Sequence, residues 1–241
     1  MNKEFERQTL LLGESAMEKL KKAKVALFGV GGVGSYAAEA LARSGVGSIT
    51  LVDNDVVSLS NINRQLCALH STVGKYKVEV VKERLLDINP ELCVNTRCEF
   101  VLPDNIKSFE LYDYDYVIDA IDTVSGKLAI IEECNKHSTP IISCMGTGNK
   151  QDPTALCVTD ITKTTTCPLA RVMRRELKKR GIAHLRVVYS TEEAMTPLDR
   201  ITTEGNKVVP GSLAFVPSVA GLIAAGEAVK QMLAKEDDAN G

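Results

Sequence analysis

The chain has 241 residues, of which 44% are hydrophobic and 25% are charged, and its formal net charge is −2. These values are normal for a soluble globular protein that can bury a substantial core, and the near-neutral charge indicates no class of partner for the chain as a whole. Neither the N-terminal "MNKEFERQTL" nor the longest apolar stretch, which contains Pro217 and Glu227, predicts a signal peptide or a membrane span. The seven cysteines include no CxxC pair, so reduced thiols in a cytoplasmic protein are expected and a four-cysteine zinc site is not.

Short apolar runs alternate with segments of helical periodicity from residue 24 onward. This alternation predicts an α/β fold with a Rossmann-like, mostly parallel sheet and helices on both faces. Two strands in the C-terminal half, on either side of a basic helix, are expected to add to the sheet edge as antiparallel strands. The predicted strands are 24–30, 48–53, 115–122, 140–146, 154–161 and 185–190, and the predicted helices are 33–45, 75–90, 125–137 and the basic segment 163–181. Residues 212–233 are expected to form a strand and then a helix, followed by a frayed acidic tail.

Glycines at positions 29, 31 and 34 satisfy the pattern GxGxxG between a predicted strand and a predicted helix, and Asp53 lies 19 positions after Gly34. Together they predict a nucleotide site, because the tight turn brings backbone N–H groups and a helix N-terminus close to an anion. An NAD-dependent dehydrogenase, a non-catalytic NAD-binding module and a tight turn without a ligand are all open at this point. We expect one domain over 1–241, with a nucleotide-binding core at 1–150 and a substrate-binding elaboration with a C-terminal strand and helix at 151–241.

The residues around the glycine pattern favour a nucleotide that reacts over one that is only held. An enzyme that splits ATP between its phosphates needs cations at the leaving group and a carboxylate near a metal ion. The chain supplies such side chains at Asp53, Asp55, Asn61, Arg64, Lys77 and Asp122. Asp122 is expected at the end of a strand, where the topology would place it beside the glycine loop. Taken singly, Arg64 and Lys77 would more ordinarily form surface salt bridges.

The segments "GVGGVGS", "LVDNDVVSLSNINRQ", "VGKYKVE" and "DAIDT" resemble, in order and spacing, the ATP-binding core of the ThiF/MoeB family, the bacterial relatives of ubiquitin-activating enzymes. The resemblance covers about residues 5–150 and implies adenylation, in which a carboxylate attacks the α-phosphate of ATP and pyrophosphate leaves. It implies that Asp53 holds the ribose hydroxyls and that Asp122 binds Mg²⁺ through ATP. The ATP-binding residues implied are Gly29, Gly31, Gly32, Gly34, Asp53, Asp55, Asn61, Arg64, Lys77 and Asp122.

The segment "FERQTLL" near the start resembles the part of these enzymes that sends an arginine into the ATP site of the partner subunit. This implies a homodimer in which Arg7 acts in trans. The catalytic residues implied are Asp122, Arg64, Lys77 and Arg7, and ATP and Mg²⁺ are the expected cofactors.

Residues 163–180 contain seven basic residues and one acidic residue. Helical spacing places Arg171, Arg174, Arg175 and Lys178 on one face, and a phosphate backbone is the partner that best suits such a face. The default alternative is a solvated surface. The RNA-binding residues expected are Arg171, Arg174, Arg175, Lys178 and Lys179.

This basic segment and "AFVPSVAGLIAAGE" resemble the branch of the family that dehydrates threonylcarbamoyladenosine next to the anticodon of tRNA. The resemblance implies a ligase-class enzyme that adenylates the threonyl carboxylate and lets the neighbouring carbamoyl group close on it. No protein nucleophile is then required, so Cys167 is expected to be a packing residue. tRNA, a second copy of the chain, and a cysteine desulfurase or sulfur-acceptor protein are the expected partners. The alternative is an adenylyltransferase for a ubiquitin-like sulfur carrier, although that branch usually adds CxxC pairs, which this chain lacks.

Overall fold

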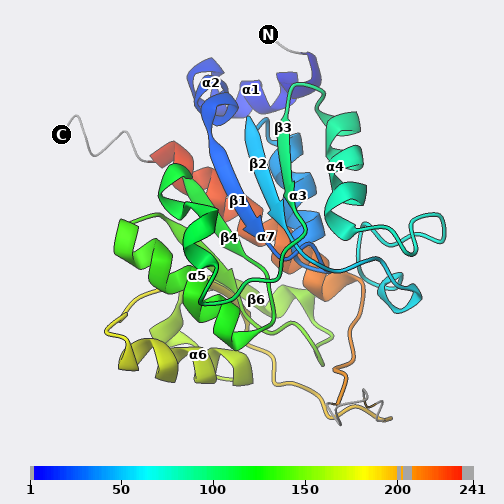
Figure 1. Cartoon of the computed structure of the whole chain (residues 1–241), viewed down its shortest axis with the longest axis vertical. Coiled ribbons are helices and arrows are strands. Elements are labelled where there is room, and N and C mark those ends of the chain that lie inside the picture. Colours follow the sequence, from blue (N-terminus) through cyan, green and yellow to red (C-terminus); the bar gives the residue numbers. More distant parts are fainter. Residues whose placement is uncertain (1–2, 200–201, 203–207, 235–241) are drawn as a thin grey trace.

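A computed structural model describes residues 3–199, 202 and 208–234 of the chain. Within these residues, seven strands form one sheet in the order β3-β2-β1-β4-β5-β7-β6 (Figure 1). The strands are β1 (Lys24–Phe28), β2 (Ser48–Val52), β3 (Cys93–Arg97), β4 (Tyr116–Asp119), β5 (Ile141–Cys144), β6 (Leu156–Asp160) and β7 (Arg186–Ser190). The helices are α1 (Glu6–Leu12), α2 (Glu14–Lys22), α3 (Gly34–Arg43), α4 (Lys77–Ile88), α5 (Val124–His137), α6 (Pro168–Lys179) and α7 (Phe215–Ala234).

Neighbouring strands run parallel throughout the sheet, except that β6 is antiparallel to β7 at one edge. The predicted α/β fold with a mostly parallel sheet is therefore confirmed. The expectation that both C-terminal strands are antiparallel additions is wrong for β7, which pairs in parallel with β5 and places Ile142 opposite Arg186. Because the parallel strands share one direction, their carboxyl ends meet at the end of the sheet away from α1 and α2 (Figure 1).

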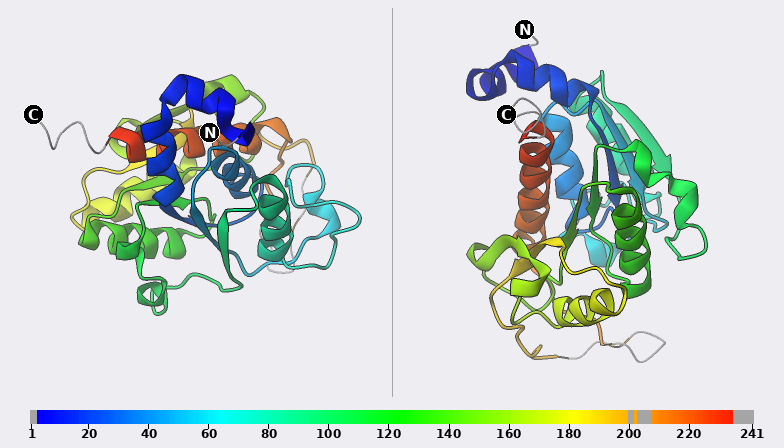
Figure 2. Two further views of the ribbon diagram at one scale, coloured as in Figure 1. Left: turned by 90° about the horizontal axis from the view of Figure 1, so that it is seen from above. Right: turned by 90° about the vertical axis from the view of Figure 1, so that its left-hand side faces the viewer.

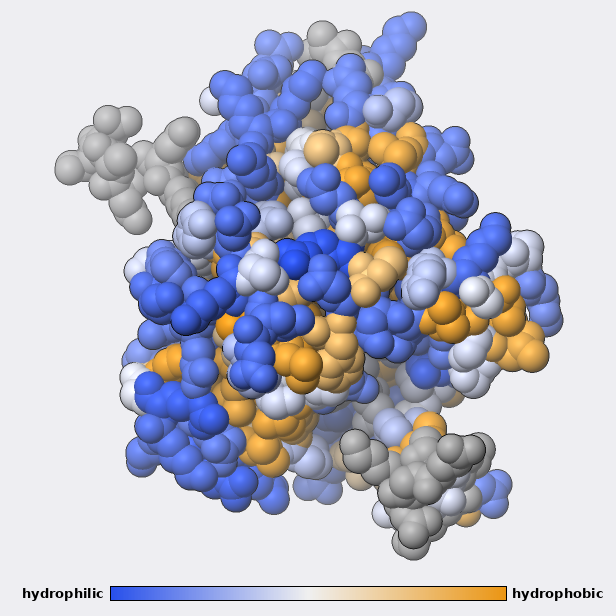
Figure 3. All heavy atoms as spheres, in the orientation of Figure 1, coloured by the Kyte–Doolittle hydropathy of each residue, from blue (hydrophilic) through white to orange (hydrophobic). Residues whose placement is uncertain are grey.

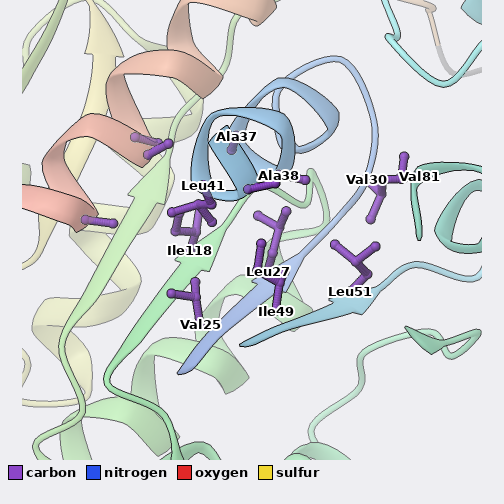
Figure 4. Packing of buried hydrophobic residues seen from close by; sticks show 14 of the residues in the cluster. Val25, Leu27, Val30, Ala37, Ala38, Leu41, Ile49, Leu51, Val81 and Ile118 are labelled. Carbon is purple, nitrogen blue, oxygen red and sulfur yellow. The ribbon is translucent and has the colours of Figure 1, made fainter. Parts of the chain in front are cut away.

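Helices cover both faces of the sheet (Figure 2). On one face, α2, α3, α4 and α7 pack against Val25, Leu27 and Ile49 of the central strands (Figure 4). The intervening residues Ala26 and Phe28 face the other side, where α5 covers them, and α6 packs against β7 on that same side. Successive strand residues point to opposite faces, so strands buried on both faces are apolar almost without interruption.

The last predicted segment is a single helix, and the strand expected at its start does not form. The chain before α7 is irregular, and Val209, Pro210 and Ser212 border a cavity. Pro217 lies in the first turn of α7, where its missing N–H removes no intrahelical hydrogen bond. The acidic tail expected at the C-terminus lies, from residue 235 onward, outside the described residues.

Three elements have no clear signal in the sequence pattern: α1, α2 and β3. The strand β3 is half exposed at the edge of the sheet, so it lacks the continuous apolar run of the central strands. Of the helices in the described ranges, none combines the length and apolarity needed to cross a membrane.

Candidate active site

A cavity of about 770 Å³ lies at the carboxyl ends of the parallel strands. Its walls come from the β1–α3 loop, the segments that follow β2 and β5, the β4–α5 loop and the chain that leads into α7. The predicted ATP-binding residues that line it are Gly29, Gly31, Gly32, Asp53, Asp55, Asn61, Arg64, Lys77 and Asp122. The topology thus gathers side chains that are far apart in the sequence around one volume, and its size is typical of a small-molecule site.

The glycine loop is a close-packed turn between β1 and α3. Gly29 has φ +85°, and a Cβ built on it would lie 2.7 Å from the carbonyl oxygen of Ala120. Gly34 does not line the cavity but lies beneath it, and its Cβ would come within 1.8 Å of the carbonyl oxygen of Gly29. Both positions therefore require glycine, since any side chain would push α3 away from the sheet. The N-terminal turn of α3, with its free N–H groups, is thereby held at the cavity.

Asp53 directly follows β2 and joins the glycine loop to the next turn. Its Oδ2 accepts a hydrogen bond from the Val30 N–H at 2.7 Å, and its Oδ1 accepts one from the Asp55 N–H at 2.8 Å. The carboxylate is therefore fixed at the rim of the cavity by two backbone donors. This is the position expected for the acid that holds ribose hydroxyls in a nucleotide-binding fold.

Two cations, Lys77 and Arg64, line the same cavity as the glycine loop. Lys77 is the first residue of α4, and its Nζ donates to Asp55 Oδ2 at 2.6 Å. The Lys77 side chain is 6% exposed and the Asp55 side chain is 60% exposed, so the lysine is held in place while its partner stays accessible. Arg64 Nη1 donates to the Ser60 carbonyl at 2.8 Å and to Asn63 Oδ1 at 2.9 Å.

Asn61 and Asp122 differ in how tightly the fold holds them. Asn61 is buried, and its Oδ1 accepts the Ser58 N–H at 3.1 Å, so it also stabilises the turn that carries Arg64. Asp122 is exposed and lines the cavity. The expectation that it ends a strand is wrong: β4 ends at Asp119, and Asp122 lies in the loop that leads to α5. A loop position leaves its carboxylate open to the cavity.

The remaining predicted residues lie outside the cavity. Arg7 is exposed on α1, at the far end of the sheet (Figure 1). On α6, Arg171, Arg175, Lys178 and Lys179 are exposed. Arg174 differs from these four residues, because it is half-buried and its Nη1 donates to the carbonyl oxygen and to Oγ1 of Thr164.

Glu176 cancels part of the positive charge of α6. It accepts hydrogen bonds from Lys179 at 2.9 Å and from Arg180 at 3.1 Å, and these lower the pKa of its carboxyl group to about 2. Glu176 therefore stays ionised at neutral pH. Leu169, in the first turn of the same helix, lines the cavity, so α6 runs from the cavity wall to the basic surface.

The thiols near the cavity are packed as core residues. Cys144 borders the cavity, and burial raises the pKa of its thiol to about 12, which keeps it protonated at neutral pH. Cys167 is 1% exposed, within the apolar cluster under α6, as expected for a packing residue. All seven cysteines are free.

Part of the cavity wall has no signal in the sequence. Val209, Pro210 and Ser212 border the cavity, and two asparagines from distant segments hold residues 211 and 212 in place. Asn63 Nδ2 donates to the Ser212 carbonyl at 2.9 Å, and Asn149 Oδ1 accepts the Gly211 N–H at 2.6 Å. Only the folded chain brings these segments together, so no spacing in the sequence could have indicated this wall.

Comparison with known proteins places this site in a family. The family model described as "ThiF family" matches residues 5–241. The chain is 48% identical over 240 residues to the tRNA threonylcarbamoyladenosine dehydratase of Bacillus subtilis, covering 95% of this chain and 94% of the relative.

Two solved structures of the E. coli tRNA N6-threonylcarbamoyladenosine dehydratase are similar to the whole chain. The complex with ATP has a TM-score of 0.89 at 39% identity, covering 99% of this chain and 96% of that chain. The complex with AMP has a TM-score of 0.89 at 40% identity, covering 98% and 96%. The order of motifs around the glycine loop, the cavity that they form and these full-length matches lead to one conclusion: the chain belongs to the ThiF family.

Proposed function

We propose that this chain is a tRNA threonylcarbamoyladenosine dehydratase that activates the threonyl carboxylate of its substrate with ATP. The observation that carries the proposal is the pair of cations, Arg64 and Lys77, on the wall of the cavity that the glycine loop borders, with Asp122 on the same cavity. A site that only holds a nucleotide gains nothing from this set. The relatives named tRNA threonylcarbamoyladenosine dehydratase, one of them solved with ATP, support the substrate and the nucleotide.

The roles of the residues follow from the negative charge that develops on the phosphates during the reaction. A carboxylate oxygen of the threonyl group attacks the α-phosphorus, the bond to the bridging oxygen breaks, and pyrophosphate leaves with the electron pair. Arg64 and Lys77 stabilise the charge on the departing pyrophosphate, while the N–H groups at the start of α3 hold the phosphates. The carbamoyl group then attacks the activated carbonyl carbon, AMP leaves, and a proton is released. The net change in the nucleoside is the loss of one water.

The ring closure is intramolecular, which explains why the site needs no thiol. The carbamoyl and carboxyl groups belong to the same side chain of the modified adenosine, so the attacking group is present at a high effective concentration. This agrees with the burial of Cys144 and Cys167. A cysteine desulfurase or sulfur-acceptor protein as a partner stays a prediction.

Mg²⁺ fits the residues on the cavity. Its preferred ligands are carboxylate and phosphate oxygens, and the accessible carboxylate of Asp122 lies on the same cavity as the phosphate-binding loop. Bound by Asp122 and the phosphates of ATP, the ion would neutralise negative charge as the α-phosphate is attacked.

The exposed basic residues of α6 are the proposed contact for the tRNA backbone. Hydrophilic side chains cover this helix at the lower left of the molecule (Figure 3). The contact set is Arg171, Arg175, Lys178 and Lys179, and Arg174 is left out because it holds Thr164. Because α6 begins at the cavity, RNA bound along it would present a modified base to the nucleotide.

A homodimer is part of this proposal. On α1, Leu10 is 79% exposed and Leu11 is 87% exposed, and the loop at 56–76 exposes Leu59 (64%) and Leu69 (55%) beside the cavity. Hydrophobic atoms are visible on this loop at the right of the molecule (Figure 3). In a twofold dimer, α1 of one subunit can cover this loop of its partner, which would bring Arg7 to the partner's cavity.

The test incubates the purified chain with ATP, Mg²⁺ and tRNA that carries threonylcarbamoyladenosine, and then weighs the digested nucleosides by mass spectrometry. We expect a nucleoside lighter by one water, formed only when ATP is present. An unchanged mass, with ATP–pyrophosphate exchange only after a ubiquitin-like carrier protein is added, would assign the chain to sulfur-carrier activation. Tight NAD binding without ATP turnover would instead make it an NAD-binding module.

A further inference from the structure

A fully buried lysine lies directly behind the cavity, on α5. The Lys127 side chain is 0% exposed, and its Nζ donates to Asp119 Oδ2 at 2.9 Å, to Ser143 Oγ at 3.2 Å and to the Cys144 carbonyl at 2.8 Å. An ammonium group has three N–H donors, so all of them are used. Ser143 Oγ in turn donates to Asp119 Oδ2 at 2.5 Å. No member of this group lines the cavity except Cys144.

The partners of Lys127 sit where two strands pass into the walls of the cavity. Asp119 is the last residue of β4, and Cys144 is the last residue of β5. The loop after β4 carries Asp122, and its backbone is tied to the same group because Asp119 Oδ1 accepts the Ile121 N–H at 3.3 Å. The loop after β5, residues 145–148, forms another part of the wall, and β5 is the strand next to β4 in the sheet. One ammonium group therefore connects α5 to the bases of both loops.

Stability alone does not explain a charged pair at this position. Removing two charges from water is costly, and an apolar pair of similar volume often serves a protein core as well or better. The neighbouring residues of α5, Leu128, Ile130 and Ile131, are apolar and buried. The charged hydrogen bonds instead hold β4, β5 and α5 in fixed positions relative to one another. The Lys127 ammonium group also neutralises the Asp119 carboxylate, whose negative charge would otherwise lie unpaired behind a site that must accept phosphates.

We propose that Lys127 is a positioning residue for the adenylation step. With Asp119 and Ser143, it holds the loop of Asp122 and the loop at 145–148 at the separation that brings metal, nucleotide and acceptor carboxylate into line. This inference rests on the proposed function, because it assigns a role within that reaction.

The test separates positioning from folding. In the double variant Lys127→Met with Asp119→Asn, the buried charges are removed together, so no unpaired charge is left in the core. We expect a melting temperature close to that of the wild type, an ATP dissociation constant changed less than about 3-fold, and a kcat for dehydration lowered about 10- to 100-fold. Ile130→Ala is the matched control: it lies on the same helix, is fully buried, makes no hydrogen bond with the Lys127 group and does not line the cavity. It should lower the melting temperature and leave kcat of the folded protein unchanged.

Ser143→Ala provides a second test, which does not require that the double variant folds. It removes one hydrogen bond of the group and should lower kcat by about 3- to 10-fold without changing the ATP dissociation constant. A kcat equal to that of the wild type in folded variants would overturn the role of Lys127 while leaving the proposed function intact. A wild-type chain that does not dehydrate the nucleoside would overturn the proposed function and this inference with it.

Discussion

Asp122 and Lys77 face the same cavity but differ in how far their side chains can move. Lys77 is buried at the start of α4 and paired with the exposed Asp55 at 2.6 Å, so its position is set before a nucleotide arrives. An incoming phosphate has only to compete with a carboxylate that is well solvated. The Asp122 side chain is exposed and can adjust to its ligand, although the base of its loop is tied to Asp119. The site therefore combines a prearranged cation with an adaptable carboxylate.

Replacing Asp122 tests the part of the site that acts on the reacting phosphate. We expect Asp122→Asn to lower the rate of dehydration by about 10²- to 10³-fold, since it removes a charge used in the transition state, and to change ATP affinity only a few-fold. Rates come from nucleoside mass spectrometry and affinity from calorimetry. Asp87→Asn, an exposed aspartate on α4, is the control and should behave as the wild type. Full activity in Asp122→Asn would remove Asp122 from the mechanism.

Gly34 offers a test of the packing under the glycine loop. A Cβ at this position would lie 1.8 Å from the Gly29 carbonyl, so Gly34→Ala must displace α3 and should lower the free energy of unfolding by about 1–3 kcal/mol. Gly226→Ala on α7 is the control, because nothing lies within 4 Å of its Cβ, and it should raise the free energy of unfolding by about 0.5–1 kcal/mol. Urea denaturation gives both values. Equal effects of the two substitutions would contradict this account of the loop.

At the scale of single elements, α6 is the proposed contact for the tRNA backbone. Its buried side, Ala170, Met173 and Leu177, packs against α5 and β7, and this fixes the direction in which the basic side faces. The helix also links the basic surface to the cavity through Leu169. A bound tRNA would therefore be oriented relative to the nucleotide by one rigid helix.

The role of this helix can be measured through the salt dependence of tRNA binding. Arg171→Ala combined with Arg175→Ala should weaken binding and reduce the slope of log K against log salt by about 1 for each lost phosphate contact. ATP affinity should not change. Arg43→Ala on α3, whose side chain is 57% exposed, is the control. An unchanged slope in the double variant would leave α6 as a solvated surface.

At the scale of the whole molecule, the exposed leucines of α1 and of the loop at 56–76 lie at opposite ends of the sheet. A single subunit cannot bring them together, whereas the proposed twofold pair of subunits would. The same arrangement would complete each site with an arginine from the other subunit. This makes the homodimer a requirement of the proposed catalytic set and not only a means of covering apolar surface.

Mixing inactive variants tests this arrangement directly. If Arg7 acts in trans, subunits with Arg7→Ala and subunits with Asp122→Asn form heterodimers in which one of the two sites has both residues. Random exchange of subunits should then restore about a quarter of wild-type activity. No restoration, in a mixture shown by mass spectrometry to contain heterodimers, would exclude action of Arg7 in trans. Leu11→Asp should weaken the dimer, as measured by sedimentation.

Much of the fold and of the cavity could be read from the sequence because the signals are local. Buried parallel strands are apolar without interruption, so their pattern predicts the core. The glycine pattern marks the turn that can approach a phosphate, and the predicted ATP-binding residues other than Gly34 line one cavity. The direction of β7 could not be read, because the apolar pattern of a buried strand is the same in either orientation. The strand expected before α7 does not form, because Phe215 and Val216 already belong to the first turn of that helix and Leu213 is exposed.

The sequence by itself determined the α/β class, the ThiF-type motifs and the predicted ATP-binding residues, of which all but Gly34 line the cavity, since each depends on a periodicity or spacing within the chain. Only the tertiary structure decided that Arg174 holds Thr164 instead of joining the exposed basic surface, that Asp122 lies in a loop, and that Lys127 connects the ends of β4 and β5. The physical reason is the same in each case. The partner of a side chain depends on which segments the order of strands places side by side. That order cannot be predicted from the spacing of residues within any one segment.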